Sequence, residues 1–193
     1  EERFLANHIP GARLVLPQET QAGPPIPGLC PSLEQLSHVM RRIGLNDESH
    51  VVVYDDEGGG WAGRFIWLLD EIGHKNYSYL NGGLHAWAGE GFEMVAGHSD
   101  VAPSEIALSL NNEHSLSASQ IKQQLEIGDL QVWDARSPME YRGESVYAAR
   151  GGHIPGALNY EWTRAMDQQN NLRLKPLSSL EEELNEVGIS KEK

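Results

Sequence analysis

Hydrophobic positions in the first half of the chain follow first a helical and then a strand period. Apolar residues recur every three or four positions over Leu33–Ile43, which predicts an amphipathic helix that Gly44 ends. The β-branched run Val51–Tyr54 predicts a buried central strand. A helix over 61–73 and a strand over 77–80 follow. Strands that alternate with helices predict an α/β fold with a parallel sheet flanked by helices.

The chain contains the same local pattern twice. The sequence His-Ile-Pro-Gly-Ala at residues 8–12 recurs at residues 153–157, 145 positions later. The amphipathic stretch that ends at Gly44 recurs as Leu180–Val187 before Gly188, 144 positions later. Two features repeated at nearly one offset indicate two homologous domains in tandem.

The boundaries of these domains follow from composition. Residues 1–95 form the first predicted domain, and residues 115–193 the second, which opens on a helix capped by Ser117 or Ser119. The segment 96–114 between them is polar and rich in Ser, His, Asp and Pro, which predicts a linker. Residues 106–110 within it have the composition of a short strand.

We expect both domains to be incomplete. In the second domain a strand over 130–133 precedes the turn, whereas the first domain has no room for its equivalent before residue 8. The first domain continues past Glu48 with a strand, a loop that begins at Asp55, and a helix. The repeat places the counterpart of that loop about six residues after Lys193. In open parallel sheets, ligands bind at such loops, outside the carboxyl ends of the strands.

Composition restricts the partners that the protein can have. The formal net charge is −13, which argues against a broad surface for nucleic acid or for an anionic membrane. No apolar run reaches the ~20 residues that span a bilayer. Cys30 is the only cysteine, so no internal disulfide forms, and we expect a cytoplasmic location. Cys30 lies in a loop rich in Pro and Gly, and we interpret it as an incidental thiol.

The glycine-rich loop of the first domain does not indicate nucleotide binding. Residues 58–60 are all glycine, but the Lys-Ser/Thr pair of a P-loop is absent. A loop that joins a strand to a helix N-terminus instead gathers free N–H groups that favour an anion. A cysteine in such a place would have a lowered pKa and would exist largely as thiolate.

In this order, the motifs resemble the rhodanese superfamily. The features that match are the two His-Ile-Pro-Gly-Ala turns, Asp134-Ala135-Arg136, Tyr54-Asp55 with its glycine loop, and Asn81-Gly82-Gly83 with Trp87. Two such domains in tandem resemble bacterial thiosulfate:cyanide sulfurtransferases. The resemblance implies that a cysteine in the second domain takes sulfur from thiosulfate and passes it, as a persulfide, to a thiophilic acceptor such as cyanide. It implies no metal and no organic cofactor. Asp55 stands where the cysteine would be, so the first domain is expected to be inactive.

Four charged residues of the second domain are candidates for the site. Asp134 and Arg136 end a predicted strand on the face of the expected loop. They either form a structural ion pair, or Arg136 helps to hold an anionic donor. Arg142 and Arg150 could add positive potential for thiosulfate.

Neighbouring residues bear on donor choice and on the fold. Glu140 stands near a position where mercaptopyruvate-type relatives carry an arginine, and a glutamate there would repel a carboxylate donor. Trp162 is either a core or interface aromatic or, by resemblance, a wall of the catalytic pocket. His8 and His153 occur in both copies, which favours a structural role bonded to nearby backbone.

Three other functions stay open at this point. The chain could belong to a catalytically inactive binding or regulatory module, to a mercaptopyruvate sulfurtransferase, or to a phosphatase with the same fold. The fifteen residues after Lys193 would separate a sulfurtransferase, which has a cysteine there, from an inactive module, which has another residue, and from a phosphatase, whose cysteine loop is one residue longer. We expect residues 1–193 alone to show no turnover. Two domains packed together make a monomer sufficient.

Overall fold

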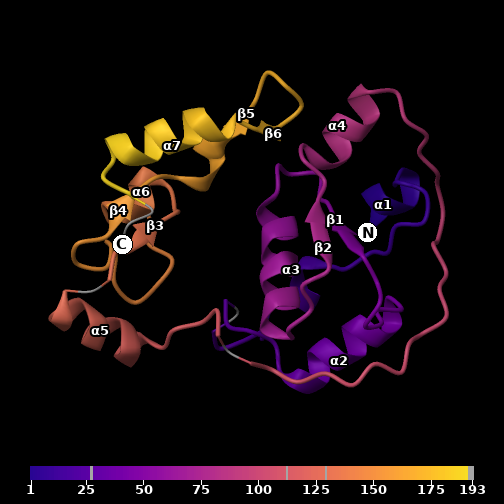
Figure 1. The fold of residues 1–193 in the computed structure, drawn as a ribbon, viewed down its shortest axis with the longest axis horizontal. Helices are drawn as coiled ribbons and strands as arrows, with labels where there is room; N and C mark the ends of the chain where they lie inside the picture. The colour runs from indigo at the N-terminus through magenta and orange to yellow at the C-terminus, as the bar shows by residue number, and fades with distance from the viewer. Residues whose placement is uncertain (27, 112, 129, 191–193) are drawn as a thin grey trace. The chain divides into compact units, whose positions relative to one another are not determined.

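The computed structural model describes residues 1–26, 28–111, 113–128 and 130–190 (Figure 1). The chain divides into two compact units, Glu1–His114 and Ser115–Lys193. The elements of the first unit are α1 (Glu2–Ala6), η1 (Pro17–Thr20), α2 (Leu33–Arg42), β1 (Val51–Val53), α3 (Gly60–Glu71), β2 (Tyr77–Tyr79) and α4 (Gly83–Gly89).

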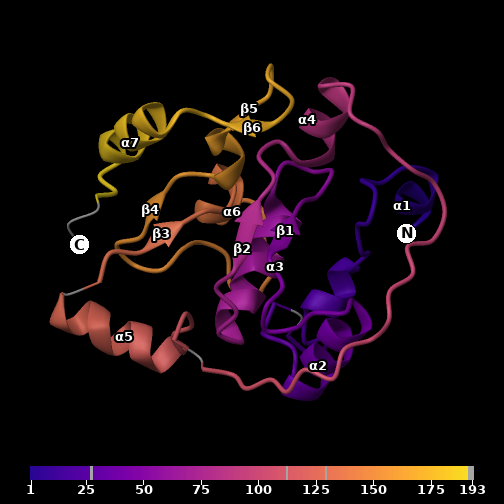
Figure 2. The ribbon, with the colours of Figure 1, turned by 45° about the vertical axis from the view of Figure 1, so that its right-hand side comes forward.

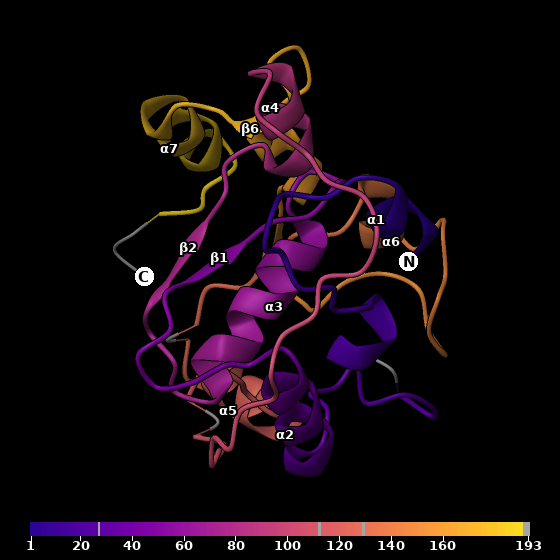
Figure 3. The ribbon, with the colours of Figure 1, turned by 90° about the vertical axis from the view of Figure 1, so that its right-hand side faces the viewer.

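The first unit contains the predicted parallel sheet. Strands β1 and β2 pair in parallel with Val51 opposite Tyr77, and α3 connects them and packs beside them (Figure 3). Successive side chains of a strand point to opposite faces. Val53 is therefore buried toward the helix, while Val52 is 56% exposed. The prediction of a strand buried on both faces is wrong for β1 as described.

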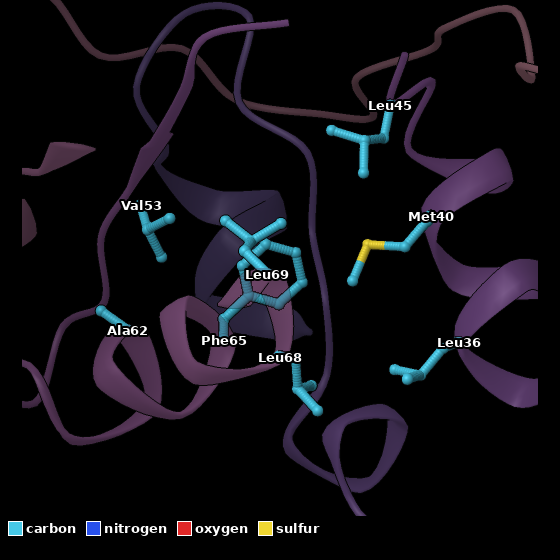
Figure 4. Close-up of a cluster of buried hydrophobic side chains, with 8 residues drawn as sticks. All are labelled: Leu36, Met40, Leu45, Val53, Ala62, Phe65, Leu68 and Leu69. Carbon is cyan, nitrogen blue, oxygen red and sulfur yellow. The ribbon is translucent and has the colours of Figure 1, made fainter. Parts of the chain in front are cut away.

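The core of the first unit lies between α2, α3 and β1 (Figure 4). Its centre is Leu36 and Met40 of α2 packed toward Leu68 and Leu69 of α3, all of them essentially inaccessible to solvent. The spacing of four between Leu36 and Met40 places both on one helix face. Gly44 then ends α2 with a φ of +75°, the left-handed conformation that glycine adopts readily.

The segment predicted as a linker packs along the first unit. Ile106, Leu108 and Leu110 lie against its core, and Arg41 Nε donates to the Ile106 carbonyl at 3.0 Å. The prediction of a strand over 106–110 is wrong, because these residues form no ladder with any described strand. Side chains and single hydrogen bonds hold the segment in place.

The second unit repeats the plan of the first. Strands β3 and β4 pair in parallel with Trp133 opposite Leu158 (Figure 2). Ser117 caps the first helix by accepting from the Gln120 N–H, as predicted. The elements are α5 (Ala118–Ile127), β3 (Trp133–Asp134), α6 (Pro138–Tyr141), β4 (Leu158–Asn159), η2 (Trp162–Ala165), β5 (Met166–Asp167), β6 (Arg173–Leu174) and α7 (Leu177–Glu186).

The internal repeat of the sequence is also a repeat of structure. The short helices η1 and η2 begin 145 residues apart, at Pro17 and Trp162, and the helices α2 and α7 begin 144 residues apart, at Leu33 and Leu177. Both longer helices end before a glycine with positive φ. The predicted class, two α/β domains each with parallel strands, is confirmed.

Candidate functional site

The loop between β1 and α3 encloses a carboxylate. Asp55 Oδ1 accepts hydrogen bonds from the main-chain N–H groups of Glu57 and Gly59 at 3.0 and 2.8 Å. Its Oδ2 accepts from those of Trp61 and Ala62, both at 3.0 Å. Four N–H groups therefore converge on one anionic side chain at the start of a helix, where the helix dipole also favours negative charge.

Glycines allow the backbone to curl around this carboxylate. Gly58 and Gly59 have φ of +91° and +104°, which side chains other than glycine rarely permit. Gly83 approaches from the neighbouring loop, where an added Cβ would collide with the Asp55 carbonyl oxygen. The same carbonyl accepts from the Leu84 N–H at 3.0 Å. The loop is thus an anion nest whose anion is supplied by the chain itself.

The carboxyl end of β3 carries a bidentate ion pair. Arg136 Nε and Nη2 donate to the two carboxylate oxygens of Asp134 at 2.9 and 2.6 Å. Arg136 Nη2 also donates to the Gly152 carbonyl at 2.9 Å. Asp134 is 8% exposed, and the hydrogen bonds from Arg136 lower the pKa of its carboxyl. This geometry connects the end of β3 to the loop before the second turn.

Asn159 completes this edge, and the sequence analysis did not identify it. Its Nδ2 donates to the carbonyls of Asp134 and Arg136 at 2.9 and 2.8 Å. The Trp162 N–H donates to the Ala135 carbonyl at 3.0 Å, so η2 begins at the same edge. One signal was available: in the first copy the position equivalent to Asn159 is Leu14. A polar residue in one copy alone indicates a role beyond the shared fold.

A hollow of about 600 Å³ opens beside β3. Asp134, Arg136, Arg150 and His153 line it together with apolar and glycine residues. Asp134 offsets the charge of Arg136, so Arg150 gives this wall its net positive charge, which suits a small anion.

Arg142 and Glu140 are engaged with other residues. Arg142 Nε and Nη2 donate to the two carboxylate oxygens of Glu144 at 2.7 and 2.9 Å, with both side chains about half exposed. Glu140 accepts from the N–H and the hydroxyl of Ser137 and so caps α6. Trp162 is 41% exposed. The structure thus brings Asp134, Arg136 and the backbone of Trp162 together, while Arg142 is paired with its own neighbour.

His8 and His153 make the same two contacts, a hydrogen bond to a nearby carbonyl and a stack on the aromatic ring of the same residue. His8 Nδ1 lies 2.8 Å from the Phe4 carbonyl, and its ring stacks on that of Phe4 at 4.0 Å. His153 Nδ1 lies 2.7 Å from the Tyr141 carbonyl and stacks on the Tyr141 ring at 3.6 Å. A carbonyl can only accept, so Nδ1 donates in both. The predicted bonding to nearby backbone is confirmed.

The lone thiol is poorly suited to nucleophilic chemistry. Burial and the charge of Glu71 raise the pKa of Cys30, and Arg64 opposes them more weakly. Arg64 itself donates to the carbonyls of Thr20 and Leu29 and stacks over Trp67. Within the described part of the chain, no group of three or more potential ligands could hold a metal ion. No helix among the same residues has the length and apolarity to cross a membrane.

Comparison with known proteins identifies the family. The model of the rhodanese-like domain matches residues 1–90 and 117–193. The chain belongs to the rhodanese-like family. It is 52% identical over 192 residues to a thiosulfate sulfurtransferase of Azotobacter vinelandii and 46% identical to one of Pseudomonas aeruginosa, in both cases over 99% of this chain and 70% of the relative. The two copies of the internal repeat are therefore tandem rhodanese-like domains.

A solved rhodanese structure has the same fold. SseA from Escherichia coli, described as a 3-mercaptopyruvate sulfotransferase, superposes with a TM-score of 0.87 at 28% identity. The match covers 97% of this chain and 71% of SseA. Human 3-mercaptopyruvate sulfurtransferase is 32% identical over 172 residues.

Proposed function

We propose that the intact protein is an enzyme that transfers sulfane sulfur from thiosulfate to a thiophilic acceptor such as cyanide. The reaction passes through the persulfide of a cysteine in the second domain. The two relatives that are 52% and 46% identical are both named thiosulfate sulfurtransferase. The observation that carries the mechanism is the nest around Asp55. There the strand-to-helix loop of the first domain binds an anion with four main-chain N–H groups.

The internal repeat supports a position for the nucleophile. The counterpart of Asp55 falls about six residues after Lys193, and we place the catalytic cysteine there. This chain covers 70% of the two thiosulfate sulfurtransferases, so they contain sequence beyond the part that matches. A nest of main-chain N–H groups there would hold a thiolate, and later a persulfide anion, as the nest of the first domain holds a carboxylate.

The backbone after α7 is held beside the segment that leads into β3. The Gln131 side chain, just before β3, donates to the Gly188 carbonyl at 2.9 Å and accepts from the Ser190 N–H at 3.2 Å. In the first domain β1 likewise follows α2 and leads into the Asp55 loop. The repeat puts the counterpart of β1 at about residue 195, and a strand there that paired in parallel with β3 would bring its loop to the edge formed by Asp134 and Asn159.

The chemistry balances in two steps. The thiolate attacks the sulfane sulfur of thiosulfate, an S–S bond forms, and sulfite leaves with the electron pair of the bond that breaks. The carbon of cyanide then attacks the outer sulfur, thiocyanate leaves, and the thiolate is regenerated. Neither step requires a metal, an oxidant or an organic cofactor.

We assign roles to the candidate residues on this basis. Arg136 fixes the edge through Asp134 and Gly152, while Arg150 supplies the net positive charge of the hollow, because Asp134 offsets that of Arg136. Arg142 contributes less, because Glu144 offsets its charge. Trp162, at the start of η2, provides an apolar wall. The first domain, residues 1–95, is an inactive partner because Asp55 occupies its own nest.

The assay of the full-length protein tests this function. We expect thiocyanate to form from thiosulfate and cyanide, and expect a substitution of the proposed cysteine by serine to abolish it. A full-length sequence with another residue at that position would exclude the enzyme and leave a binding module. Residues 1–193 alone should give no thiocyanate.

The choice of donor separates the alternatives. A mercaptopyruvate sulfurtransferase would show a higher kcat/KM for 3-mercaptopyruvate than for thiosulfate, and we expect the reverse. A phosphatase would hydrolyse an aryl phosphate, and we expect no hydrolysis.

We also propose a cytoplasmic monomer that binds no nucleic acid. Size-exclusion chromatography, cell fractionation and a DNA-binding assay check these points.

A further inference from the structure

Glu183 of α7 is the centre of a polar cluster beneath η2. It accepts from the hydroxyl of Tyr160 at 2.8 Å and from Lys175 Nζ at 2.7 Å, and Arg164 Nη2 lies 3.6 Å away. Tyr160 is only 1% exposed. Burial and the bond to Glu183 raise the pKa of Tyr160 to about 12, so its hydroxyl stays protonated as a donor. Glu183 belongs to the acidic run 181–183, but its carboxylate is held by Tyr160 and Lys175.

The first domain provides an internal comparison for this cluster. Its helix α2 carries apolar residues at the positions that match those of α7, with Leu36 and Met40 equivalent to Leu180 and Leu184. The position equivalent to Glu183 is Val39, which is 5% exposed. The positions equivalent to Tyr160 and Lys175 are Val15 and Pro31. The inactive copy thus has three nonpolar residues where the other copy has a hydrogen-bonded tyrosine, lysine and glutamate.

The fold does not require polar groups at these positions. The charged side chains of the cluster are partly exposed, 24% for Glu183 and 30% for Lys175, and ion pairs with that exposure contribute little to stability. The first domain joins η1 to α2 through a different pair, in which Arg42 Nη2 donates to both carboxylate oxygens of Glu19 at 2.8 and 2.9 Å. A function beyond folding is therefore the better explanation for the cluster in the second domain.

The cluster fixes the short helix that reaches the candidate site. Trp162 opens η2, and its N–H donates to Ala135 at the carboxyl end of β3. Arg164, on the same short helix, lies over the Tyr160 ring with its guanidinium carbon 4.4 Å from the ring centroid. Glu183, on α7, binds the Tyr160 hydroxyl and attracts Arg164 of η2. These contacts connect α7 to η2 and orient η2 at the edge of β3.

We propose that Glu183 is a positioning residue that orients η2 and, through η2, the side of the site that binds the sulfur donor. This role rests on the proposed sulfur transfer. It differs from that proposal in predicting an effect on one half-reaction. In a mechanism with two separate half-reactions, kcat/KM for thiosulfate reports the first and kcat/KM for cyanide reports the second.

The test uses the full-length protein and four variants. Glu183→Val introduces the residue of the first domain, and we expect kcat/KM for thiosulfate to fall about tenfold while kcat/KM for cyanide changes less than about twofold. Tyr160→Phe, which keeps the ring, should give a smaller fall in the same direction. Glu183→Gln keeps an acceptor for the tyrosine hydroxyl and should restore most of the activity with thiosulfate. Glu182→Val changes an exposed neighbour on the same helix and should have no effect.

The outcomes separate this role from plain destabilisation. Loss of folded enzyme would lower both kcat/KM values by one factor, and that result would overturn the proposal, as would unchanged kinetics in Glu183→Val. If Glu183→Val does not fold, Tyr160→Phe and Glu183→Gln test the proposal instead. The quantity compared is again the ratio of kcat/KM for thiosulfate to kcat/KM for cyanide. An unsubstituted full-length protein without activity would contradict the proposed function itself, before any variant is compared.

Discussion

The Asp55 carboxylate accepts a hydrogen bond from the main-chain N–H of Ala62, seven residues further along the chain, at 3.0 Å. This contact closes the loop between β1 and α3 onto a single anion. It also explains why the first domain is silent in the proposed reaction. A nest already filled by a carboxylate has no room for a sulfur anion. Its geometry serves as the internal model for the catalytic loop of the second domain.

Removing this carboxylate should loosen the loop. Asp55→Ala leaves four N–H groups without their acceptor, and we expect a loss of about 2 to 3 kcal/mol in the free energy of unfolding. Amide hydrogen exchange checks this, because exchange over residues 57–62 should accelerate. Asp56→Ala is the matched control: it removes an exposed pair with Arg3 and should change stability by less than about 0.5 kcal/mol. Equal protection in both variants would contradict the nest.

The hairpin between β5 and β6 contains a strained residue. Asn171 and Leu172 have φ of +52° and +57°, and the Arg173 N–H donates to the Asn170 carbonyl at 3.1 Å, as in a type I′ turn. Leucine is disfavoured in this conformation. Leu172→Gly should therefore raise the free energy of unfolding by about 1 kcal/mol. Asn171→Gly should gain less, since asparagine tolerates the conformation. Thermal denaturation of both variants measures the difference. A larger gain in stability from Asn171→Gly than from Leu172→Gly would disprove the assignment of strain to Leu172.

The sequence predicted those parts of the fold that depend on local pattern. Helix α2 follows from its apolar spacing, and the parallel pairing of β1 with β2 follows from the alternation of strand and helix. The exposure of Val52 and the absence of a strand over 106–110 did not follow, because both depend on what packs beside the segment. A strand requires a hydrogen-bonded partner, and composition does not specify one.

The candidate site was predictable only in part, for a similar reason. Asp134 and Arg136 lie two residues apart and could be identified as a possible pair. Asn159 acts on backbone carbonyls about 25 residues away, and Glu183 meets Tyr160 across 23 residues, so neither contact appears in a local pattern. Both residues stand out once the two copies are compared, because the first domain has Leu14 and Val39 there.

Acid should destabilise the second unit through Asp134. The hydrogen bonds from Arg136 hold the pKa of its carboxyl below the ordinary value of 3.8 in the folded state. A lowered folded pKa gives stability that is present above about pH 4 and is lost as the pH falls through the folded pKa. Asp134→Asn should therefore be less stable than the parent at pH 6, and its stability should fall less steeply between pH 4 and 2. Urea denaturation at several pH values measures both slopes, with Glu182→Gln as a control on an exposed carboxylate.

The nest of the first domain should activate a thiol placed within it. In Asp55→Cys, the sulfur would meet N–H groups at the start of α3, and a thiolate there should have a pKa below the ordinary ~8.5 of cysteine. Cys30 of the same chain serves as the reference thiol, because burial and Glu71 raise its pKa.

The measurement is alkylation by iodoacetamide at pH 7, followed at each cysteine by peptide mass spectrometry. Residue 55 should react at least tenfold faster than Cys30, since a lowered pKa increases the thiolate fraction. The difference should shrink only as the pH rises above 9, where Cys30 begins to ionise. Asp56→Cys controls for loop exposure without the nest and should not show the enhanced rate at pH 7. If residue 55 reacted no faster than residue 56, the four N–H groups would not stabilise a sulfur anion, and the model for the catalytic loop would lose its physical basis.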